Sequence, residues 1–221
     1  MQSNKRITIL CGHYGTGKTN VAVNLALEMA KEHPVTVADL DIVNPYFRTL
    51  DSADAFAAAG IRMICSKFAN SNVDIPSLPP DLYAITDDKS RRVVVDVGGD
   101  DSGAFVLGRL APAILAENSY EMLLVVNRFR PMTPDIPSTV EVMREIEAAA
   151  GLTFTGIVNN SNLGEETTAE TVLSSLDYAA DLAKATGLPL VATTVKATLY
   201  DELKGQIHHL FPLTLQQNKP F

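Results

Sequence analysis

The sequence predicts an α/β protein: a doubly wound, mostly parallel sheet of about seven strands with helices on both faces. Short β-rich runs alternate with long helical patterns along the chain. Several of these runs are apolar on consecutive residues, as in strands that are buried on both faces. Gly60, Gly151 and Gly187 follow helical patterns and mark their ends. Residues 1–221 are expected to form one domain, because no linker or repeat divides them.

Each predicted strand is a short run of β-branched and other apolar residues. They are Arg6–Cys11, Val35–Asp39, Ile61–Cys65, Arg92–Val97, Met122–Val126, Phe154–Asn159 and Leu190–Ala192. The helical patterns between them are Thr19–Glu32, Pro45–Ala59, Gly103–Glu117, Pro137–Ala150 and Thr168–Thr186.

Two further segments have no strand pattern. Ser66–Asp88, with three prolines, is expected to be irregular, as either a lid, a partner-facing loop or a plain surface excursion. Leu199–Phe211 is amphipathic but has a single lysine, so we expect it to dock on the core rather than on a membrane.

Composition excludes several classes of protein. The net charge of −8 argues against a broad nucleic-acid footprint, although Arg128–Arg130 is a short basic spot. Cys11 and Cys65 stand apart, which argues against a thiolate metal site and fits a reducing compartment. No apolar run approaches ~18 residues, so no membrane span is expected. The N-terminus leads into a strand rather than a signal segment, and we expect a cytoplasmic protein.

The stretch GHYGTGKT, residues 12–19, predicts a phosphate-binding loop between a strand and a helix. Its glycines let backbone N–H groups surround phosphate oxygens at a helix N-terminus. Lys18 would reach the β- and γ-phosphates, and the Thr19 hydroxyl would be a ligand of Mg²⁺. The residues expected to contact the nucleotide here are Gly12, His13, Tyr14, Gly15, Thr16, Gly17, Lys18, Thr19 and Asn20.

Carboxylates that follow two strands would complete this site. Asp96 ends a strand before a Gly-Gly pair, so it suits Mg²⁺, and Gly99 could offer its N–H to the γ-phosphate. Asp39 and Asp41 are separated by Leu40 alone, and in an extended chain their two side chains point to the same side. One could organise the metal shell while the other orients water; Asp41 could equally cap the next helix.

These three pieces together, GHYGTGKT, DLDIVNPYF and VVVDVGG, resemble MinD/ParA-type ATPases, a branch of P-loop proteins that includes nitrogenase iron protein. The resemblance covers nearly the whole chain. It implies ATP- and Mg²⁺-dependent switching, often through a nucleotide-sandwich homodimer. It also implies that Asp41 orients the attacking water, that Asp39 supports the metal shell, and that Asp96 is the acidic residue of the second metal motif.

The same family contacts adenine through an asparagine after a late strand. Here Asn159 and Asn160 follow such a strand, and the spacing after Gly156 favours Asn160. An amide can both donate to and accept from the adenine edge. Two asparagines in an ordinary polar turn would look the same. The stretch ATTVKAT, residues 192–198, would lie beside the base, and a guanine-specific N-K-x-D motif is absent from the sequence.

The chain departs from the family pattern at one position in the loop. His13 stands where the family has a lysine that reaches the partner's phosphates, and an imidazole is mostly neutral at pH 7. His13 would replace that charge only if phosphates raised its pKa; otherwise it packs or faces solvent. The missing cysteine pair disfavours electron transfer, and the acidic composition disfavours a DNA partner.

The leading hypothesis is therefore an ATPase that switches between ATP and ADP forms, hydrolyses slowly and is read by a protein partner. Lys18 would neutralise charge on the phosphoryl group and Asp41 would position water. A second hypothesis is an ATP-dependent ligase or kinase like dethiobiotin synthetase, with a small carboxylate substrate bound near Ser66–Asp88 or Arg128–Arg130. A third is a nucleotide-sensing scaffold that does not hydrolyse.

Overall fold

One parallel sheet of eight strands organises the chain, in the order β3-β2-β4-β1-β5-β6-β7-β8. The computed structural model describes residues 1, 4–40, 53–65, 80–99, 101–131, 133 and 135–214. The strands are β1 Ile7–Cys11, β2 Val35–Leu40, β3 Arg62–Cys65, β4 Arg92–Val97, β5 Tyr120–Val126, β6 Gly156–Asn159, β7 Leu190–Lys196 and β8 Leu210–Leu213. The central β1 lies between β4 and β5, as the doubly wound prediction requires.

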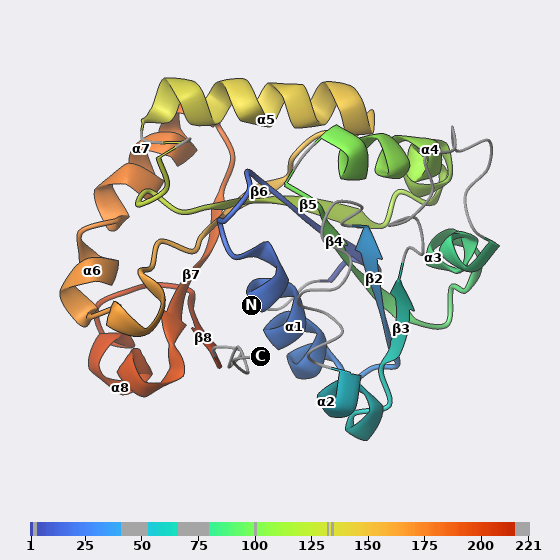
Figure 1. The fold of residues 1–221 in the computed structure, drawn as a ribbon, viewed down its shortest axis with the longest axis horizontal. Helices are drawn as coiled ribbons and strands as arrows, with labels where there is room; N and C mark the ends of the chain where they lie inside the picture. Colours follow the sequence, from blue (N-terminus) through green and yellow to red (C-terminus); the bar gives the residue numbers. More distant parts are fainter. Residues whose placement is uncertain are drawn as a thin grey trace, which may run out of the picture.

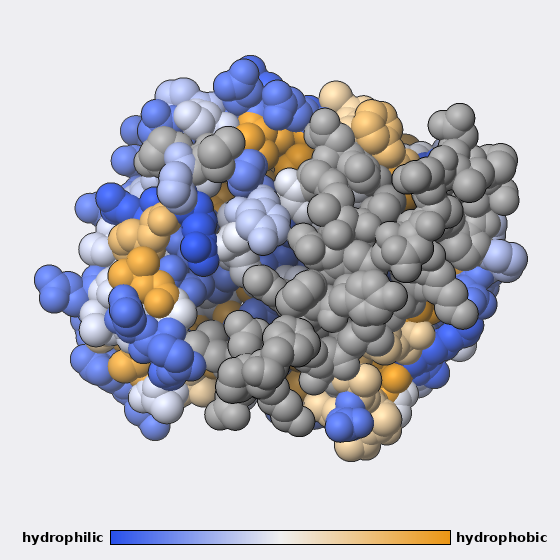
Figure 2. Space-filling view, viewed as in Figure 1, coloured by the Kyte–Doolittle hydropathy of each residue, from blue (hydrophilic) through white to orange (hydrophobic). Residues whose placement is uncertain are grey.

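Helices connect these strands on both faces. They are α1 Lys18–Met29, α2 Ala53–Ala58, α3 Ala84–Asp87, α4 Asp101–Glu117, α5 Ile136–Ala150, α6 Ala169–Leu173, α7 Leu176–Thr186 and α8 Tyr200–Leu203. Short 3₁₀ helices are η3 Pro80–Tyr83, η4 Gly164–Glu166 and η5 Ala197–Leu199. In Figure 1 helices α4, α5 and α7 run along one face of the sheet, and α1 and α2 lie on the other. Figure 2 shows that hydrophilic residues predominate over α6, α7 and α8 on the face in view.

The two faces of the sheet bury separate apolar layers. Ile7 and Ile9 of β1 pack with Leu107 of α4, whereas Leu10 packs on the opposite face with Leu25 of α1. All five residues of β1 are buried. Burial on both faces explains why the sequence of this strand shows no polar alternation. Within the described residues, no helix combines the length and apolarity that a membrane crossing requires.

The strand count differs from the expected seven because the segment predicted as an amphipathic docked piece ends in a strand. Leu199–Phe211 forms η5 and α8 and then enters β8. Phe211 and Leu213 are buried against the α1 side of the sheet. Pro212 is exposed between them, and β8 tolerates it because an edge strand can spare one N–H group.

Three helical expectations also change. The single helix expected over Thr168–Thr186 divides into α6 and α7, because the hydroxyls of Ser174 and Ser175 bond back to the carbonyls of Thr171 and Val172. Residues 80–87, expected to be irregular, form η3 and α3. Of the helix expected over residues 45–59, the described part is α2; residues 45–52 and 66–79 lie outside the described part of the chain.

A nearly buried ion pair fixes one end of the sheet. Arg6 donates to both carboxylate oxygens of Glu117 at the end of α4, with 2.6 Å between Nη2 and Oε2, and also to the carbonyl of Ile85 at 2.8 Å. Each side chain of the ion pair is 11% exposed. The hydrogen bonds from Arg6 lower the pKa of Glu117, although burial opposes them.

Candidate functional site

The loop between β1 and α1 depends on glycine where neighbouring strands approach it closely. A Cβ on Gly12, at φ 151°, would lie 2.3 Å from the carbonyl oxygen of Val125 in β5. A Cβ on Gly17, at φ 83°, would lie 2.4 Å from the amide nitrogen of Asn160 after β6. Both positions therefore exclude a side chain by contact and by backbone conformation.

The N-terminus of α1 is the centre of this loop, and no side chain caps it. Gly17 occupies the N-cap in a left-handed conformation, whereas α5 is capped by the carboxylate of Asp135. Lys18 is 7% exposed, and its Nζ donates to the carbonyl of His13 across the loop at 3.1 Å. Uncapped N–H groups and a lysine at a helix N-terminus form a site for an anion.

The other side chains of the loop are arranged around this turn. The buried hydroxyl of Thr16 donates to the carbonyl of His13 at 3.0 Å. Thr19 is half-buried in the first turn of α1. Asn20 accepts hydrogen bonds from Asn24 along the helix, through both its carbonyl and its side chain. Asn20 is thereby engaged with its own helix.

Two predicted metal-site carboxylates lie side by side at the same end of the sheet. Asp39 on β2 and Asp96 on β4 are direct partners in the strand register, and they are 4% and 2% exposed. The pKa of the Cys11 thiol is raised mainly by burial, and it is also lowered by the charge of Lys18 and raised by that of Asp96. These three groups are therefore neighbours. Asp41 lies outside the described residues.

These groups fit a magnesium ion. The hydroxyl of Thr19 and the carboxylates of Asp39 and Asp96 are the hard oxygen donors that Mg²⁺ prefers, and a phosphate-bound Mg²⁺ needs few protein ligands. The described residues contain no group of three or more His, Cys, Asp or Glu side chains placed to hold a metal by themselves. The arrangement therefore suits an ion shared with a bound phosphate rather than a protein-only cage.

The segment after β4 touches the phosphate-binding loop directly. A Cβ on Gly99 would lie 2.6 Å from the backbone nitrogen and Cα of Tyr14. Further along, a Cβ on Gly103 would lie 2.8 Å from the nitrogen of Gly98 and 3.1 Å from the carbonyl of Leu40. The ends of β2 and β4 and the first turn of α4 thus meet without space for a side chain. Tyr14 itself is 64% exposed.

Asn160 ties the loop to β7. Its Nδ2 donates to the carbonyl of Thr16 at 2.6 Å, and its Oδ1 accepts from the hydroxyl of Thr194 at 2.5 Å. One amide hydrogen and one lone pair of Asn160 remain for another partner. The amide of Asn159 points elsewhere: it donates to the hydroxyl of Ser175 and accepts from the backbone of Ser161.

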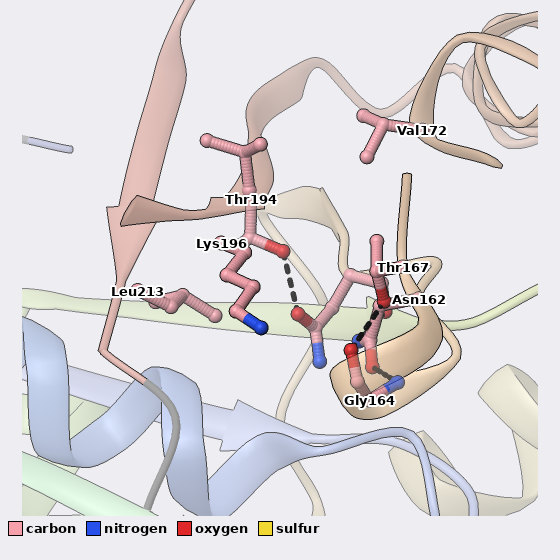
Figure 3. Close-up of a pocket in the computed structure, with 9 residues that line it drawn as sticks. Asn162, Gly164, Thr167, Val172, Thr194, Lys196 and Leu213 are labelled. Atoms are coloured by element: carbon pink, nitrogen blue, oxygen red, sulfur yellow. Dashed lines mark hydrogen bonds between the residues drawn. The ribbon is translucent and has the colours of Figure 1, made fainter. Parts of the chain in front are cut away.

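A shallow pocket that opens to solvent lies beside Asn160. Figure 3 shows Thr194 and Lys196 of β7 on one side of it and Asn162, Gly164 and Thr167 on the other. Residues of the stretch 192–198 therefore line a pocket next to the phosphate-binding loop. Lys196 is ion-paired with the carboxylate of Glu165 at the edge of this pocket.

No protein-family model matches the chain, and no curated protein sequence matches it. Its structure is similar to that of cell division protein FtsY from Thermotoga maritima, at 17% identity and a TM-score of 0.58, over 88% of this chain and 63% of that one. FtsY from Mycoplasma mycoides is similar at 17% identity and a TM-score of 0.56, over 88% of this chain and 62% of that one. Chloroplast FtsY from Physcomitrella patens is similar at 16% identity and a TM-score of 0.52, over 87% of this chain and 59% of that one. The chain has the P-loop NTPase fold. It spans less than two thirds of the length of each of these proteins.

Two residues of this P-loop site carried no specific signal in the sequence. Thr194, whose hydroxyl donates to the amide oxygen of Asn160, is one of two threonines in β7. Arg130, in the loop after β5, lies against Gly15 of the P-loop, with 3.6 Å from its Nε to the position of a Cβ on that glycine. The basic spot Arg128–Arg130 was visible in the sequence, but its place beside the P-loop is a tertiary contact.

Proposed function

We propose that this protein is a Mg²⁺-dependent ATP-binding protein and ATPase of the MinD/ParA type, acting as a nucleotide-dependent switch for a protein partner. The observation that carries the proposal is the uncapped N-terminus of α1, with Lys18 folded across the loop and two buried carboxylates on the adjacent strands. Such a cluster has both the cationic donors for phosphate oxygens and the oxygen donors for Mg²⁺.

Side chains of the P-loop and of the strand ends would bind the nucleotide and position the attacking water. When bound, Mg²⁺ would be held by Thr19, with Asp39 and Asp96 around it, and would neutralise phosphate charge. Lys18 would exchange its hydrogen bond to the loop carbonyl for one to the β- and γ-phosphate oxygens. Asp41 would orient a water molecule for attack on the γ-phosphorus. A P–O bond to water forms, the P–O bond to ADP breaks, and a proton is released with the phosphate.

The adenine ring would lie against the stretch 192–198, over the shallow pocket beside Asn160. Asn160 supports this placement because one amide hydrogen and one lone pair remain on a side chain already fixed by Thr16 and Thr194. The amide of Asn160 would then form hydrogen bonds with both the base and the P-loop. Asn159, engaged with Ser175 and Ser161, would support the turn instead.

Calorimetric titration with ATP and ADP in the presence of Mg²⁺, together with phosphate-release kinetics, tests the enzyme proposal. Lys18→Ala should abolish nucleotide binding or turnover. Lys31→Ala is the matched control, because this exposed lysine follows the other end of α1 and pairs only with Glu28 among the described residues. Asp41→Ala should keep nucleotide affinity and lose turnover. Unchanged ATP affinity and hydrolysis in Lys18→Ala would refute the proposal.

The switch is tested by sizing the protein with ADP and with a non-hydrolysable ATP analogue. A mass change between the two nucleotides supports a switch that dimerises. Turnover that rises with a small carboxylate metabolite rather than with a protein would instead favour the ligase or kinase hypothesis. A stable ATP-bound dimer with negligible turnover would favour the scaffold.

A further inference from the structure

Arg130 brings a guanidinium to the P-loop from a different part of the chain. Its Nε, Cδ and Cζ lie 3.6, 3.7 and 3.8 Å from the position that a Cβ would take on Gly15. Gly15 has φ 79° and belongs to the run of backbone N–H groups that forms the anion site. The guanidinium therefore packs against the backbone of the loop that would surround the phosphates.

The loop that carries Arg130 is held in place by the neighbouring β6 loop. The amide of Asn127, which is 1% exposed, donates to the carbonyl of Asn162 at 3.0 Å. The backbone of Arg128 donates to the hydroxyl of Ser161, and the backbone nitrogen of Arg130 closes a turn on the carbonyl of Asn127. Arg130 thus projects from an anchored turn, so binding of an anion by its side chain does not also have to order the loop backbone.

The two arginines of this loop differ in what they contact. Arg128 donates to the carbonyl of Ser174 at 2.6 Å and lies 5.8 Å from the ring centroid of Phe129, so its charge is already engaged. Arg130 is exposed, and within the part of the chain that the structure describes its guanidinium has no hydrogen bond or ion pair. Arg130 is therefore the arginine of this loop whose donors can turn to a ligand.

His13 is a weaker source of charge at the same loop. Its Nδ1 donates to the carbonyl of Tyr14 at 3.2 Å, which turns the imidazole onto its own loop. A guanidinium is always charged and offers a planar fork of donors that matches phosphate oxygens. Of these two side chains, Arg130 is therefore the better placed to offer a cation to a bound phosphate.

We propose that Arg130 contacts the terminal phosphate oxygens of the bound nucleoside triphosphate from within the same chain, and stabilises the charge that develops during hydrolysis. This inference rests on the proposed function, because it needs a nucleotide in the P-loop. As water attacks the γ-phosphorus and the bond to ADP breaks, negative charge spreads over oxygens within reach of the guanidinium. A protein with this cation in cis has basal turnover without a second copy.

The test compares Arg130→Gln and Arg130→Lys with Arg144→Gln, which removes the same charge from an exposed position of α5. Each variant is titrated with Mg·ADP and with a Mg-bound non-hydrolysable ATP analogue, and basal phosphate release is measured at low protein concentration. We expect Arg130→Gln to keep ADP affinity within about 2-fold and to lose at least ~100-fold in turnover, toward the range of other catalytic arginines. Arg130→Lys should recover part of this loss.

The outcomes separate the two proposals. If the parent protein binds neither nucleotide, the proposed function fails, and the role of Arg130 fails with it. If the parent protein binds and hydrolyses ATP but Arg130→Gln behaves like Arg144→Gln, only the role of Arg130 is overturned. An equal loss of ADP and ATP-analogue affinity in Arg130→Gln would also overturn it, because the contact would then not be with the terminal phosphate.

Discussion

Replacing Asn160 by alanine tests whether a single amide holds the P-loop against β7. The variant deletes two short hydrogen bonds, one to the carbonyl of Thr16 and one from the hydroxyl of Thr194, at a side chain that is 1% exposed. In this variant the hydroxyl of Thr194 can still donate to the carbonyl of Asn159, 3.4 Å away. The carbonyl of Thr16 is therefore the main group left without a hydrogen bond. The unsatisfied carbonyl of Thr16 and the weakened hydrogen bond of Thr194 together should lower the free energy of unfolding by about 2–4 kcal/mol.

Urea unfolding without nucleotide measures this loss as a lower midpoint at an unchanged slope. Asn4→Ala, at an exposed asparagine, is the control and should stay within about 0.5 kcal/mol. The double variant Asn160→Ala with Thr194→Val should show a coupling of about 1 kcal/mol, because the two side chains share one hydrogen bond. A loss below about 0.5 kcal/mol in Asn160→Ala, or strict additivity in the double variant, would refute the reasoning.

Three other predictions concern the loop, the ion pair and the buried thiol. Gly17→Ala should weaken Mg·ATP binding at least ~10-fold in calorimetry, because a Cβ at φ 83° meets a buried amide at 2.4 Å; unchanged affinity would contradict this. Glu117→Gln should lose about 3 kcal/mol at pH 7 by breaking the pair with Arg6. Since the folded pKa of Glu117 is lowered, its stabilisation is present above the unfolded-state pKa of about 4.3 and disappears as pH falls through the folded value. Urea unfolding at pH 3 to 7 should therefore give a flatter profile in this variant, and parallel profiles would contradict it. Cys11, fully buried and with a raised pKa, should resist a thiol reagent at pH 8 in native protein that lacks the other cysteine, and react after unfolding; equal labelling rates would contradict this.

The sequence predicted most of the fold because its signals are local. Strands such as Ile7–Cys11 and Arg92–Val97 are apolar on consecutive residues, and the P-loop pattern fixes the connection between β1 and α1. The additional strand Leu210–Leu213 was missed because it is short, contains a proline and follows an amphipathic stretch. Whether such a piece becomes a helix or an edge strand depends on its packing beside β7, which no local pattern contains.

Some residues of the candidate site could also be predicted from local patterns, and others depend on tertiary contacts. Lys18, Thr19, Asp39 and Asp96 could be proposed because each lies near the end of a strand or opens a helix within a recognisable motif. The contact of Arg130 with Gly15 joins loops that are far apart in the sequence. Its only sequence signal was a positive charge on a loop, which by itself indicates no partner.

The close meeting of Gly103 with the ends of β2 and β4 has a mechanical consequence. The first turn of α4 rests on the nitrogen of Gly98, the carbonyl of Leu40 and the Cγ1 of Val97, which lie 2.8, 3.1 and 3.1 Å from the position of a Cβ on Gly103. Two of these three atoms belong to the backbone, which cannot move aside by a change of rotamer. A shift of either strand end would therefore press on the first turn of α4, the helix that carries Phe105, which is 63% exposed. The start of α4 is thus in direct contact with the edge of the sheet that carries the P-loop site.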